Sequence, residues 1–507
     1  MANIGERMAE DIIFTPLKIG KRFEAKNRIF RSSISGKFDN YDGSGPTQAR
    51  INWEEKFARG GVGAIITSYV PVASHGRILT NYAMIDCDER IDDWARLIRQ
   101  IHTYDCRFII QLSHSGRQRD EEGFDNHLRR IVGKKKALSS TGNREPVHGF
   151  SCQAMTGTEI QEMIAAFGEG ARRAKEAGAD GVETHSANGY LFTQFLSSGI
   201  NDRDDEYGGS LVNRARFLLE VIRAIRAKVG NEFHFQVKIS AVDRNNAVWP
   251  FEKPGNVLQD SIQVCKWVKN PIEWATAVNE KANAPREDLA TWKDVQGADA
   301  IHVSSGSSFP HPLNPPGEMP IETLARTYES VVSTGELTFR NEFLFHYPLG
   351  RWLFKTLWDR IKKSHPGYNL KLLRQAKEVT SRDMQKRLHA YQGVSLGDAR
   401  QIRQQVNIPV ICTGGFQQAS YIRKAITDGY CDAVSMARPL IANNNLVDYF
   451  RAGDDLPPRP CTYCNKCLVH AIKDPLGCYE IRRFDGDYEK MMKEVYSVYN
   501  PVHAEYS

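Results

Sequence analysis

Three polar side chains that could carry chemistry, His185, Asn188 and Tyr190, follow the apolar run of residues 179–182. The imidazole and the amide are neutral hydrogen-bond donors, and the phenol is a weak acid with an ordinary pKa of about 10. Together, such side chains can hold a carbonyl oxygen and deliver a proton beside it. The spacing alone also allows a second interpretation, in which His185 is a core histidine whose hydrogen bonds are satisfied by its neighbours.

Four cysteines near the end of the chain form the second chemical signal. They follow the pattern Cys461-x2-Cys464-x2-Cys467-x10-Cys478, which places four thiols within 18 residues. Structural zinc sites and iron–sulfur clusters both use thiolates at such spacing. The alternatives are a [4Fe–4S] cluster, a zinc ion, or cysteines without metal.

The elements that must position these residues are strands and helices in alternation. Eight short runs are almost continuously apolar, as expected for parallel strands buried on both faces, and helical patterns separate most of them. This alternation predicts an α/β fold of the (β/α)8 TIM-barrel type, with a doubly wound sheet as the alternative. The predicted strands are residues 28–33, 64–68, 108–112, 181–185, 235–239, 300–304, 409–412 and 433–436.

Two connections between these strands are too long for a single crossover helix. The fifth and sixth strands are about 60 residues apart, and the sixth and seventh are about 105 residues apart. We therefore expect large insertions in the loops after strands 5 and 6. The expected organisation is a barrel over residues 1–455, including a basic aromatic insertion at about 312–400, and a Cys-rich extension over 456–507.

Two glycine- and arginine-containing loops predict an anion site. Thr413-Gly414-Gly415 follows the seventh strand and Ala437-Arg438 follows the eighth. In TIM barrels a phosphate commonly binds between these two loops, where glycines allow close approach of the backbone and an arginine clamps the anion. Ordinary turn glycines are the alternative.

Seven motifs occur in a fixed order along the chain. They are Gln111-Leu-Ser-His-Ser-Gly-Arg117, His185-Ser-Ala-Asn-Gly-Tyr190, Gln194-Phe-Leu196, Asp205-Glu-Tyr-Gly-Gly-Ser210, Asn213-Arg-Ala-Arg-Phe217, Thr413-Gly-Gly415 and Ala437-Arg438. Together they closely resemble the Old Yellow Enzyme family of flavin oxidoreductases, over most of residues 11–310 and 405–480. The resemblance implies a (β/α)8 barrel that binds FMN and takes electrons from NAD(P)H.

The resemblance also implies roles for individual residues. His185 and Asn188 would bind an electron-withdrawing oxygen of the substrate, and Tyr190 would protonate its carbon. Gln111 would bind the flavin pyrimidine, and Ser32 or Ser33 would lie against the ring. The phosphate would lie at Gly414, Gly415, Ala437 and Arg438. Lys238 stands where many members carry arginine and would stabilise negative charge on the reduced flavin. His311 resembles a substrate-contacting histidine of dienoyl-CoA reductases.

The cysteine pattern resembles the [4Fe–4S] motif of the branch that contains dienoyl-CoA reductases and trimethylamine dehydrogenase. That branch usually shows C-x2-C-x3-C-x11-C, so this chain is one residue shorter in two of the gaps. Its members also carry a C-terminal domain for a second nucleotide. Only 29 residues follow Cys478, so we expect that domain to be lacking.

Positive charge is concentrated in one segment. The chain has a net charge of +6, whereas residues 340–387 alone contain 12 Lys/Arg against 4 Asp/Glu. Residues 343–363 predict a basic amphipathic helix with tryptophans, which could lie on a membrane surface, cap the site, or dock on its own barrel or a partner subunit. No stretch approaches 18 uncharged apolar residues. We expect a cytoplasmic protein, with peripheral membrane association as an alternative, and no nucleic-acid partner.

The expected function is an FMN-dependent NAD(P)H oxidoreductase that reduces the activated C=C bond of an enone or enoyl thioester. A second interpretation runs the same site as a dehydrogenase, desaturase or amine dehydrogenase that passes electrons to an iron–sulfur cluster. A third is a non-catalytic scaffold that binds metal and membrane. The small-molecule substrate, the preference between NADH and NADPH and the oligomeric state do not follow from the sequence.

Overall fold

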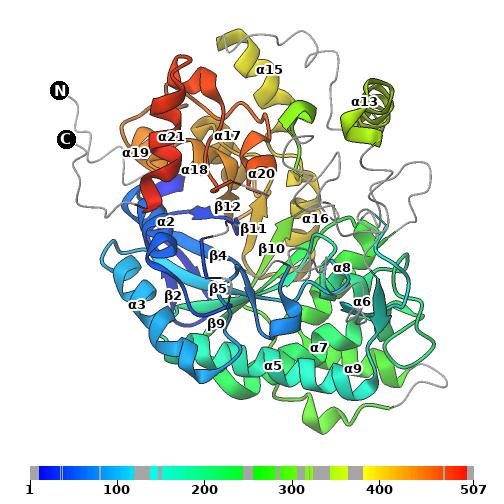
Figure 1. Cartoon of the computed structure of the whole chain (residues 1–507). Helices are drawn as coiled ribbons and strands as arrows, with labels where there is room; N and C mark the ends of the chain where they lie inside the picture. Colours follow the sequence, from blue (N-terminus) through cyan, green and yellow to red (C-terminus); the bar gives the residue numbers. More distant parts are fainter. Residues whose placement is uncertain are drawn as a thin grey trace.

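Eight parallel strands close into a barrel in the computed structural model, which confirms the predicted architecture (Figure 1). The strands follow one another around the barrel in chain order. They are β3 (Ile29–Arg31), β4 (Ala64–Pro71), β5 (Arg107–Ser113), β8 (Gly181–Ser186), β9 (His234–Ser240), β10 (Ala300–Ser304), β11 (Val410–Thr413) and β12 (Ala433–Met436). The structure describes residues 11–34, 36, 38–40, 42–78, 81–118, 137–146, 151–243, 255–280, 286–304, 306, 315–318, 320–323, 343–363, 381–471 and 474–499.

Helices surround the barrel because its strands are buried on both faces. Every residue of β4, β8 and β9 is buried. A capping box opens one of the outer helices, α5, with Thr156 and Glu159 each bonded to the other's backbone. The barrel helices are α2 (Gln48–Arg59), α3 (Ile91–His102), α5 (Gly157–Glu176), α7 (Leu211–Val229), α8 (Leu258–Lys269), α16 (Leu396–Val406), α17 (Ala419–Thr427), α18 (Arg438–Ala442) and α19 (Leu446–Arg451).

A hairpin closes the end of the barrel where the strands begin. Its strands are β1 (Leu17–Ile19) and β2 (Phe23–Ala25), paired antiparallel. Phe23 packs on the rings of Phe30 and His234, with ring centroids 6.4 and 4.4 Å apart. Apolar side chains of the hairpin and the strands form one cluster there. The functional side chains must therefore gather at the opposite end, where the strands finish.

Extra elements extend the loops at that opposite end. The long connection after β10 adds α13 (Pro348–Lys363) and α15 (Ser381–Tyr391), as the strand spacing predicts. The long connection after β9 adds α9 (Pro271–Asn279), which follows α8 and so begins near the start of β10. A small parallel pair, β6 (Ala137–Ser139) and β7 (Cys152–Ala154), follows β5, and α6 (Leu191–Leu196) follows β8. The single turns are η1 (Ile12–Phe14), η2 (Ser74–Gly76), η3 (Asp88–Arg90) and η4 (Leu289–Thr291).

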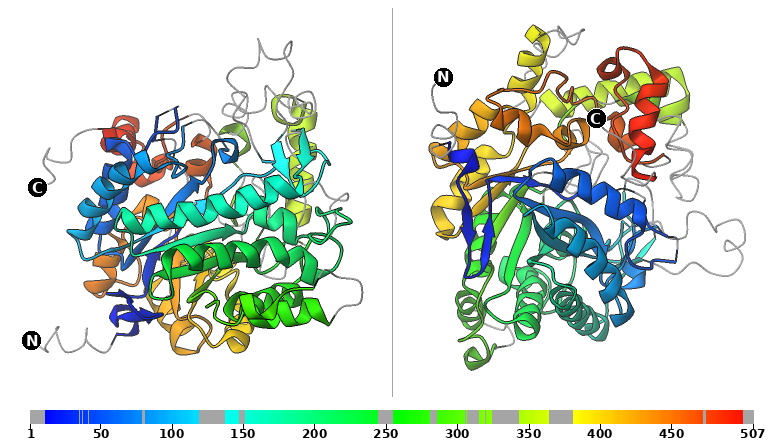
Figure 2. Two further views of the ribbon diagram at one scale, coloured as in Figure 1. Left: turned by 90° about the horizontal axis from the view of Figure 1, so that it is seen from below. Right: turned by 90° about the vertical axis from the view of Figure 1, so that its left-hand side faces the viewer.

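The C-terminal extension packs against the barrel helices. It contains α20 (Lys466–His470), η5 (Ile481–Phe484), α21 (Tyr488–Tyr496) and η6 (Ser497–Tyr499). At its end, the side-chain amide of Asn52 in α2 donates to the carbonyl of Val498 at 2.8 Å, and the right-hand view of Figure 2 shows the red C-terminal helices above the blue α2. The domain division at residue 455 stays a prediction. Among the residues described, no helix is both long and apolar enough to cross a bilayer.

Candidate active site

The end of β8 brings His185 and Tyr190 together. His185 lies within the strand, and the ring of Tyr190 returns to it with centroids 4.8 Å apart. Asn188 and Gly189 make this return through consecutive left-handed conformations, with φ of 59° and 77°. Asparagine and glycine tolerate that conformation best. The side-chain amide of Gln118 holds the turn by donating to the carbonyl of Gly189 at 2.6 Å.

His185 is a neutral, buried hydrogen-bonding group. Its side chain is 5% exposed, and its Nδ1 atom has no hydrogen-bond partner among the described residues. Burial lowers the pKa of His185 well below its ordinary value, and the cation of Lys238 lowers it further. Because the ring is neutral, it can donate a hydrogen bond without presenting a full positive charge.

Tyr69, which the sequence analysis missed, completes the aromatic wall of this site. Its ring centroid lies 5.4 Å from that of Tyr190 and 6.4 Å from that of His185. Its hydroxyl donates to the carbonyl of Gly76, and the side chain is 2% exposed. Burial raises the pKa of Tyr190, with a further contribution from Tyr82. Tyr190 therefore keeps its proton across the physiological pH range.

Lys238 and Ser33 meet across the barrel mouth, although 205 residues separate them. The Lys238 ammonium donates to the Ser33 hydroxyl at 2.9 Å. Lys238 lies beside His185 in the register of β9 with β8, and its side chain is buried. Ser32, the other serine of the prediction, is buried with its backbone N–H bonded to the carbonyl of Met436 at 2.9 Å. Of the two serines, Ser33 is the one that contacts Lys238, the lysine predicted to lie beside the flavin.

Gln111 belongs to a hydrogen-bonded layer that fills the barrel interior. Its amide donates to Glu183 Oε1 at 2.7 Å, and the amide of Gln236 donates to Glu183 Oε2. His302 bonds the same carboxylate through Nδ1 at 2.7 Å. Burial opposes ionisation of Glu183, but the contributions of His302, Lys238 and Gln236 outweigh it and lower its pKa to about 2. This anion fixes the side-chain nitrogen of Gln111.

The two predicted phosphate loops lie next to each other, at the ends of β11 and β12. Gly415 has a φ of 71°, and a Cβ at this position would lie 2.3 Å from the carbonyl oxygen of Tyr391, so only glycine fits. Arg438 begins α18, after the N-cap residue Ala437. The carbonyl of Gly414 accepts from the N–H of Gly393 at 2.6 Å. These contacts require glycine at position 415 for packing against the segment before α16, and phosphate binding at the two loops stays a prediction.

The guanidinium of Arg438 is turned toward the cysteine segment. Its Nη1 donates to the Asn465 side chain and to the carbonyl of Pro316, both at 2.5 Å. The same group lies over the ring of Tyr463, 5.4 Å from its centroid. Arg438 thus joins the predicted phosphate site to the C-terminal extension, a link that the sequence analysis did not foresee.

The four cysteines of the C-terminal pattern line one small pocket, together with Arg438 and Tyr479. None of them is in a disulfide, and burial raises the pKa of Cys461 and takes that of Cys464 to about 12. The N–H of Tyr463 points at Cys461 Sγ, 3.4 Å away. Across the described residues, no three His, Cys, Asp or Glu side chains are already spaced to hold a metal ion. The predicted metal stays a prediction.

Direct hydrogen bonds link this cysteine segment to the glycine loop. Tyr463 donates through its hydroxyl to the carbonyl of Gly415 at 2.5 Å. The side-chain amide of Gln417 pairs with the backbone of Cys461 in both directions, at 2.9 Å each. The cysteine segment and the glycine loop therefore form one hydrogen-bonded unit.

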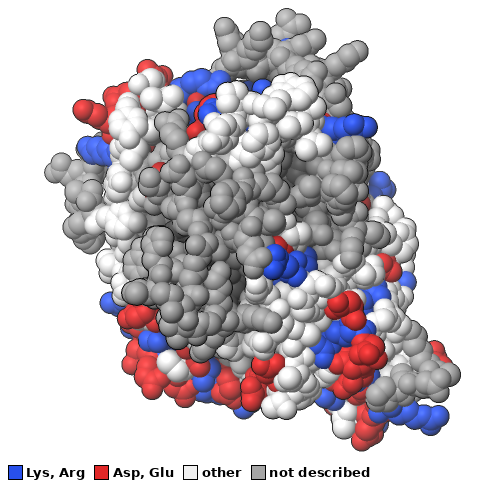
Figure 3. All heavy atoms as spheres, turned by 45° about the vertical axis from the view of Figure 1, so that its right-hand side comes forward, with Lys and Arg blue, Asp and Glu red and all other residues white. Residues whose placement is uncertain are grey.

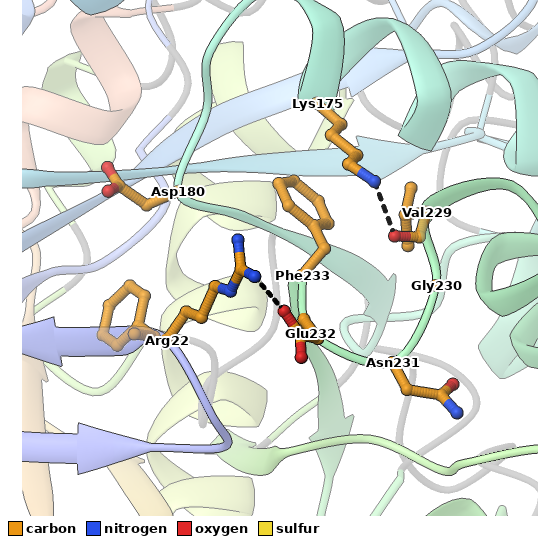
Figure 4. Close-up of a pocket in the computed structure, with 9 residues that line it drawn as sticks. Arg22, Lys175, Asp180, Val229, Gly230, Asn231, Glu232 and Phe233 are labelled. Atoms are coloured by element: carbon orange, nitrogen blue, oxygen red, sulfur yellow. Dashed lines mark hydrogen bonds and ion pairs between the residues drawn. The ribbon is translucent and has the colours of Figure 1, made fainter.

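A second hollow lies at the closed, amino-terminal end of the barrel (Figure 4). Two of its charged side chains are engaged within its own walls. Arg22 forms an ion pair with Glu232, and Lys175 donates to the carbonyl of Val229 at 2.9 Å. It is remote from the ends of the strands, so it is not the catalytic site. His311, predicted to contact substrate, lies outside the described residues.

A closed parallel barrel with these side chains at the carboxyl ends of its strands defines a TIM-barrel enzyme scaffold. A solved complex of 2-naphthoyl-CoA reductase has the same fold, with a TM-score of 0.66 and 20% identity, over 94% of this chain and 58% of that one. The profile of the NADH:flavin oxidoreductase / NADH oxidase family matches residues 12–304. The chain belongs to this family, which confirms the resemblance to Old Yellow Enzymes.

Individual relatives are similar over different shares of their length. An NADPH dehydrogenase of Bacillus licheniformis is 33% identical over 61% of this chain and 77% of its own. An NADH oxidase of Thermoanaerobacter brockii is 26% identical over 92% of this chain and 57% of its own. An N,N-dimethylglycine/sarcosine dehydrogenase of Chromohalobacter salexigens is 35% identical over 46% of this chain and 32% of its own. The match thus covers 57% of the NADH oxidase and 32% of the dehydrogenase, so the chain spans only part of the length of these two relatives.

Proposed function

We propose that this chain is an FMN-dependent NAD(P)H oxidoreductase that reduces the activated C=C bond of an enone or enoyl thioester. The observation that carries the proposal is the neutral His185, with its open Nδ1, beside the protonated Tyr190 and the buried cation of Lys238. Membership of the NADH:flavin oxidoreductase family supports it. The similarity of fold to a 2-naphthoyl-CoA reductase is consistent with an enoyl thioester.

The residues at the barrel mouth fit FMN. Lys238 and Ser33 would meet the flavin ring, Gln111 its pyrimidine edge, and Gly415 and Arg438 its phosphate. A buried ammonium suits a group that gains negative charge on reduction, and the glycine loop suits an anion. When bound, FMN supplies the hydride that the reaction needs, after accepting it from NAD(P)H.

The chain's own residues would act on the two ends of the activated alkene. His185 and Asn188 would donate hydrogen bonds to the carbonyl oxygen, which gains negative charge as hydride reaches the β-carbon. Each donor of this kind is worth about 10²–10³ in rate. Tyr190 would deliver its proton to the α-carbon. Its raised pKa keeps that proton available, and its contact with His185 keeps the hydroxyl near the bound oxygen.

We extend the proposal to a [4Fe–4S] cluster at the four cysteines. Their number, their spacing and the N–H of Tyr463 aimed at a sulfur suit thiolate ligation in a segment that closes around its metal. Iron and sulfide analysis of anaerobically purified protein tests this. About four irons and four sulfides per chain are expected, whereas zinc alone or no metal would refute the cluster.

A second candidate function is oxidation of an amine by the same site, with electrons passed to the cluster. The similarity to a dimethylglycine/sarcosine dehydrogenase favours it. Two measurements separate the candidates. Ene reduction predicts that NAD(P)H bleaches the visible flavin absorbance and that an enone or enoyl-CoA ester restores it. Bleaching by a methylated amine but not by NAD(P)H would instead establish the dehydrogenase, and protein that cannot be loaded with FMN would overturn both.

A further inference from the structure

The segment around α13 exposes an unusual number of apolar side chains. Half of the ten exposed large apolar side chains in the described part of the chain lie within eleven residues, and each is between 36% and 62% exposed. They are Phe343, Tyr347, Leu349, Trp352 and Leu353. Exposed apolar groups gathered in this way mark an interaction surface, whereas isolated ones need no explanation.

Three of these side chains share one face of α13. Leu349, Trp352 and Leu353 are spaced by three and four residues, which places them side by side on a helix. The opposite face packs internally. Phe354 contacts Phe345 and Trp358 there, with ring centroids 5.1 and 5.3 Å apart. Phe345 and Trp358 are buried, so the covered face of the helix is the one opposite the exposed side chains.

This apolar face lies on a basic helix. Within Pro348–Lys363 the sequence has five Lys/Arg and one Asp. Lys355, three residues and about one helical turn after Trp352, is exposed. Figure 1 shows α13 standing clear of the barrel helices. In Figure 3, an uncharged area with Lys and Arg on either side lies below the grey atoms of the upper edge. A partner for this face must therefore offer apolar groups to the exposed side chains and negative charge to the Lys and Arg residues around them.

We propose that α13 docks on the surface of a bilayer that contains anionic lipid. Leucine and tryptophan can enter the zone between headgroups and acyl chains while lysine and arginine remain among the lipid phosphates. A second copy of the chain suits the surface less well, because a two-fold interface would place one basic helix against the other. At 16 residues, α13 is too short to cross the membrane and would lie along it.

Co-sedimentation of the full-length protein with vesicles tests the proposal. Vesicles of phosphatidylcholine alone are compared with vesicles that contain phosphatidylglycerol as well. Binding is expected to the mixed vesicles only, with release at high salt. The double variant L349S/W352S should weaken binding at least about tenfold, because it removes apolar contact area without touching the internal face. The single variant K355E should also weaken it, at low salt only.

Tyr488→Ser is the matched control, because Tyr488 is 61% exposed and Trp352 is 62% exposed. The control should bind mixed vesicles as the parent protein does, and all variants should keep the parent melting temperature. Three outcomes overturn the proposal: no binding, equal binding to neutral vesicles, or equal loss in the Tyr488 control. A halved mass of the double variant in light scattering would overturn it too, in favour of a subunit interface. Salt-sensitive capture of an acidic protein with no vesicle binding would assign the surface to a protein partner.

Discussion

The ring of Tyr69 lies 5.4 Å from the ring of Tyr190, centroid to centroid, and the Tyr69 hydroxyl is tied to the carbonyl of Gly76. Tyr69 therefore acts on the proposed proton donor through packing rather than through a hydrogen bond. It also borders His185, so one buried side chain sets the positions of two groups that would meet the substrate.

Tyr69 is expected to be a positioning residue. Tyr69→Phe keeps the ring and loses one hydrogen bond, so alkene reduction should fall less than about tenfold. Tyr69→Ala removes the wall beside Tyr190 and should lower kcat about 10²-fold, because displaced reacting groups are costly. Steady-state kcat and KM, with NADPH-dependent flavin reduction as a control, check this. Equal loss in the two variants would mean that the hydroxyl, not the ring, matters.

Tyr190→Phe should separate the two halves of the proposed reaction. Flavin reduction by NADPH should proceed as in the parent protein, because no proton from Tyr190 is needed there. Alkene reduction should fall about 10²–10⁴-fold, the usual contribution of a general acid. Stopped-flow measurement of each half-reaction gives both numbers. If reoxidation by the alkene is unchanged, another group donates the proton.

Glu183 should make stability depend on pH in the acid range. Its folded pKa of about 2 lies below the value of about 4.3 for an unfolded glutamate. The stabilising contribution is thus complete above pH 4.3 and is lost as the pH falls toward 2. Urea unfolding of Glu183→Gln should show a flatter pH dependence in this window and a loss of about 1–3 kcal/mol at pH 7. The exposed Glu162→Gln serves as control and should behave as the parent.

Tyr463→Phe should weaken FMN binding without altering any predicted cofactor contact. It removes the hydrogen bond to the Gly415 carbonyl, and the FMN dissociation constant should rise about tenfold. Fluorescence of FMN released on dilution measures this directly. Tyr479→Phe is the matched control, because its hydroxyl donates to the carbonyl of Pro475 instead. If both variants release FMN equally, the cysteine segment does not support the glycine loop.

Short-range patterns were sufficient to predict the barrel and the neighbourhood of His185. Each strand is a local apolar run, and His185 and Tyr190 are close in sequence as well as in space. Tyr69 was not predicted because the apolar run indicates a strand that ends at Ser68. In the structure, β4 continues to Pro71 past an irregularity between Ile66 and Tyr69.

Contacts between distant segments could not be predicted in the same way. The bond between Glu183 and His302 joins residues 119 positions apart. The bond of Arg438 to Asn465 depends on how the C-terminal extension folds back. Neither residue type nor spacing encodes such pairs, because they form only when the strands are arranged around one interior.

The side-chain layer around Glu183 and the hairpin cluster beneath it fill the barrel, so only the carboxyl ends of the strands form a mouth. Under the proposed function, the nicotinamide and the alkene must enter by this mouth and take turns at one flavin face. Turnover should then follow ping-pong kinetics, with parallel double-reciprocal lines, and excess alkene should inhibit by competing with NAD(P)H. Side chains packed inside the barrel, such as Glu183 and His302, would in this way make the two substrates follow each other.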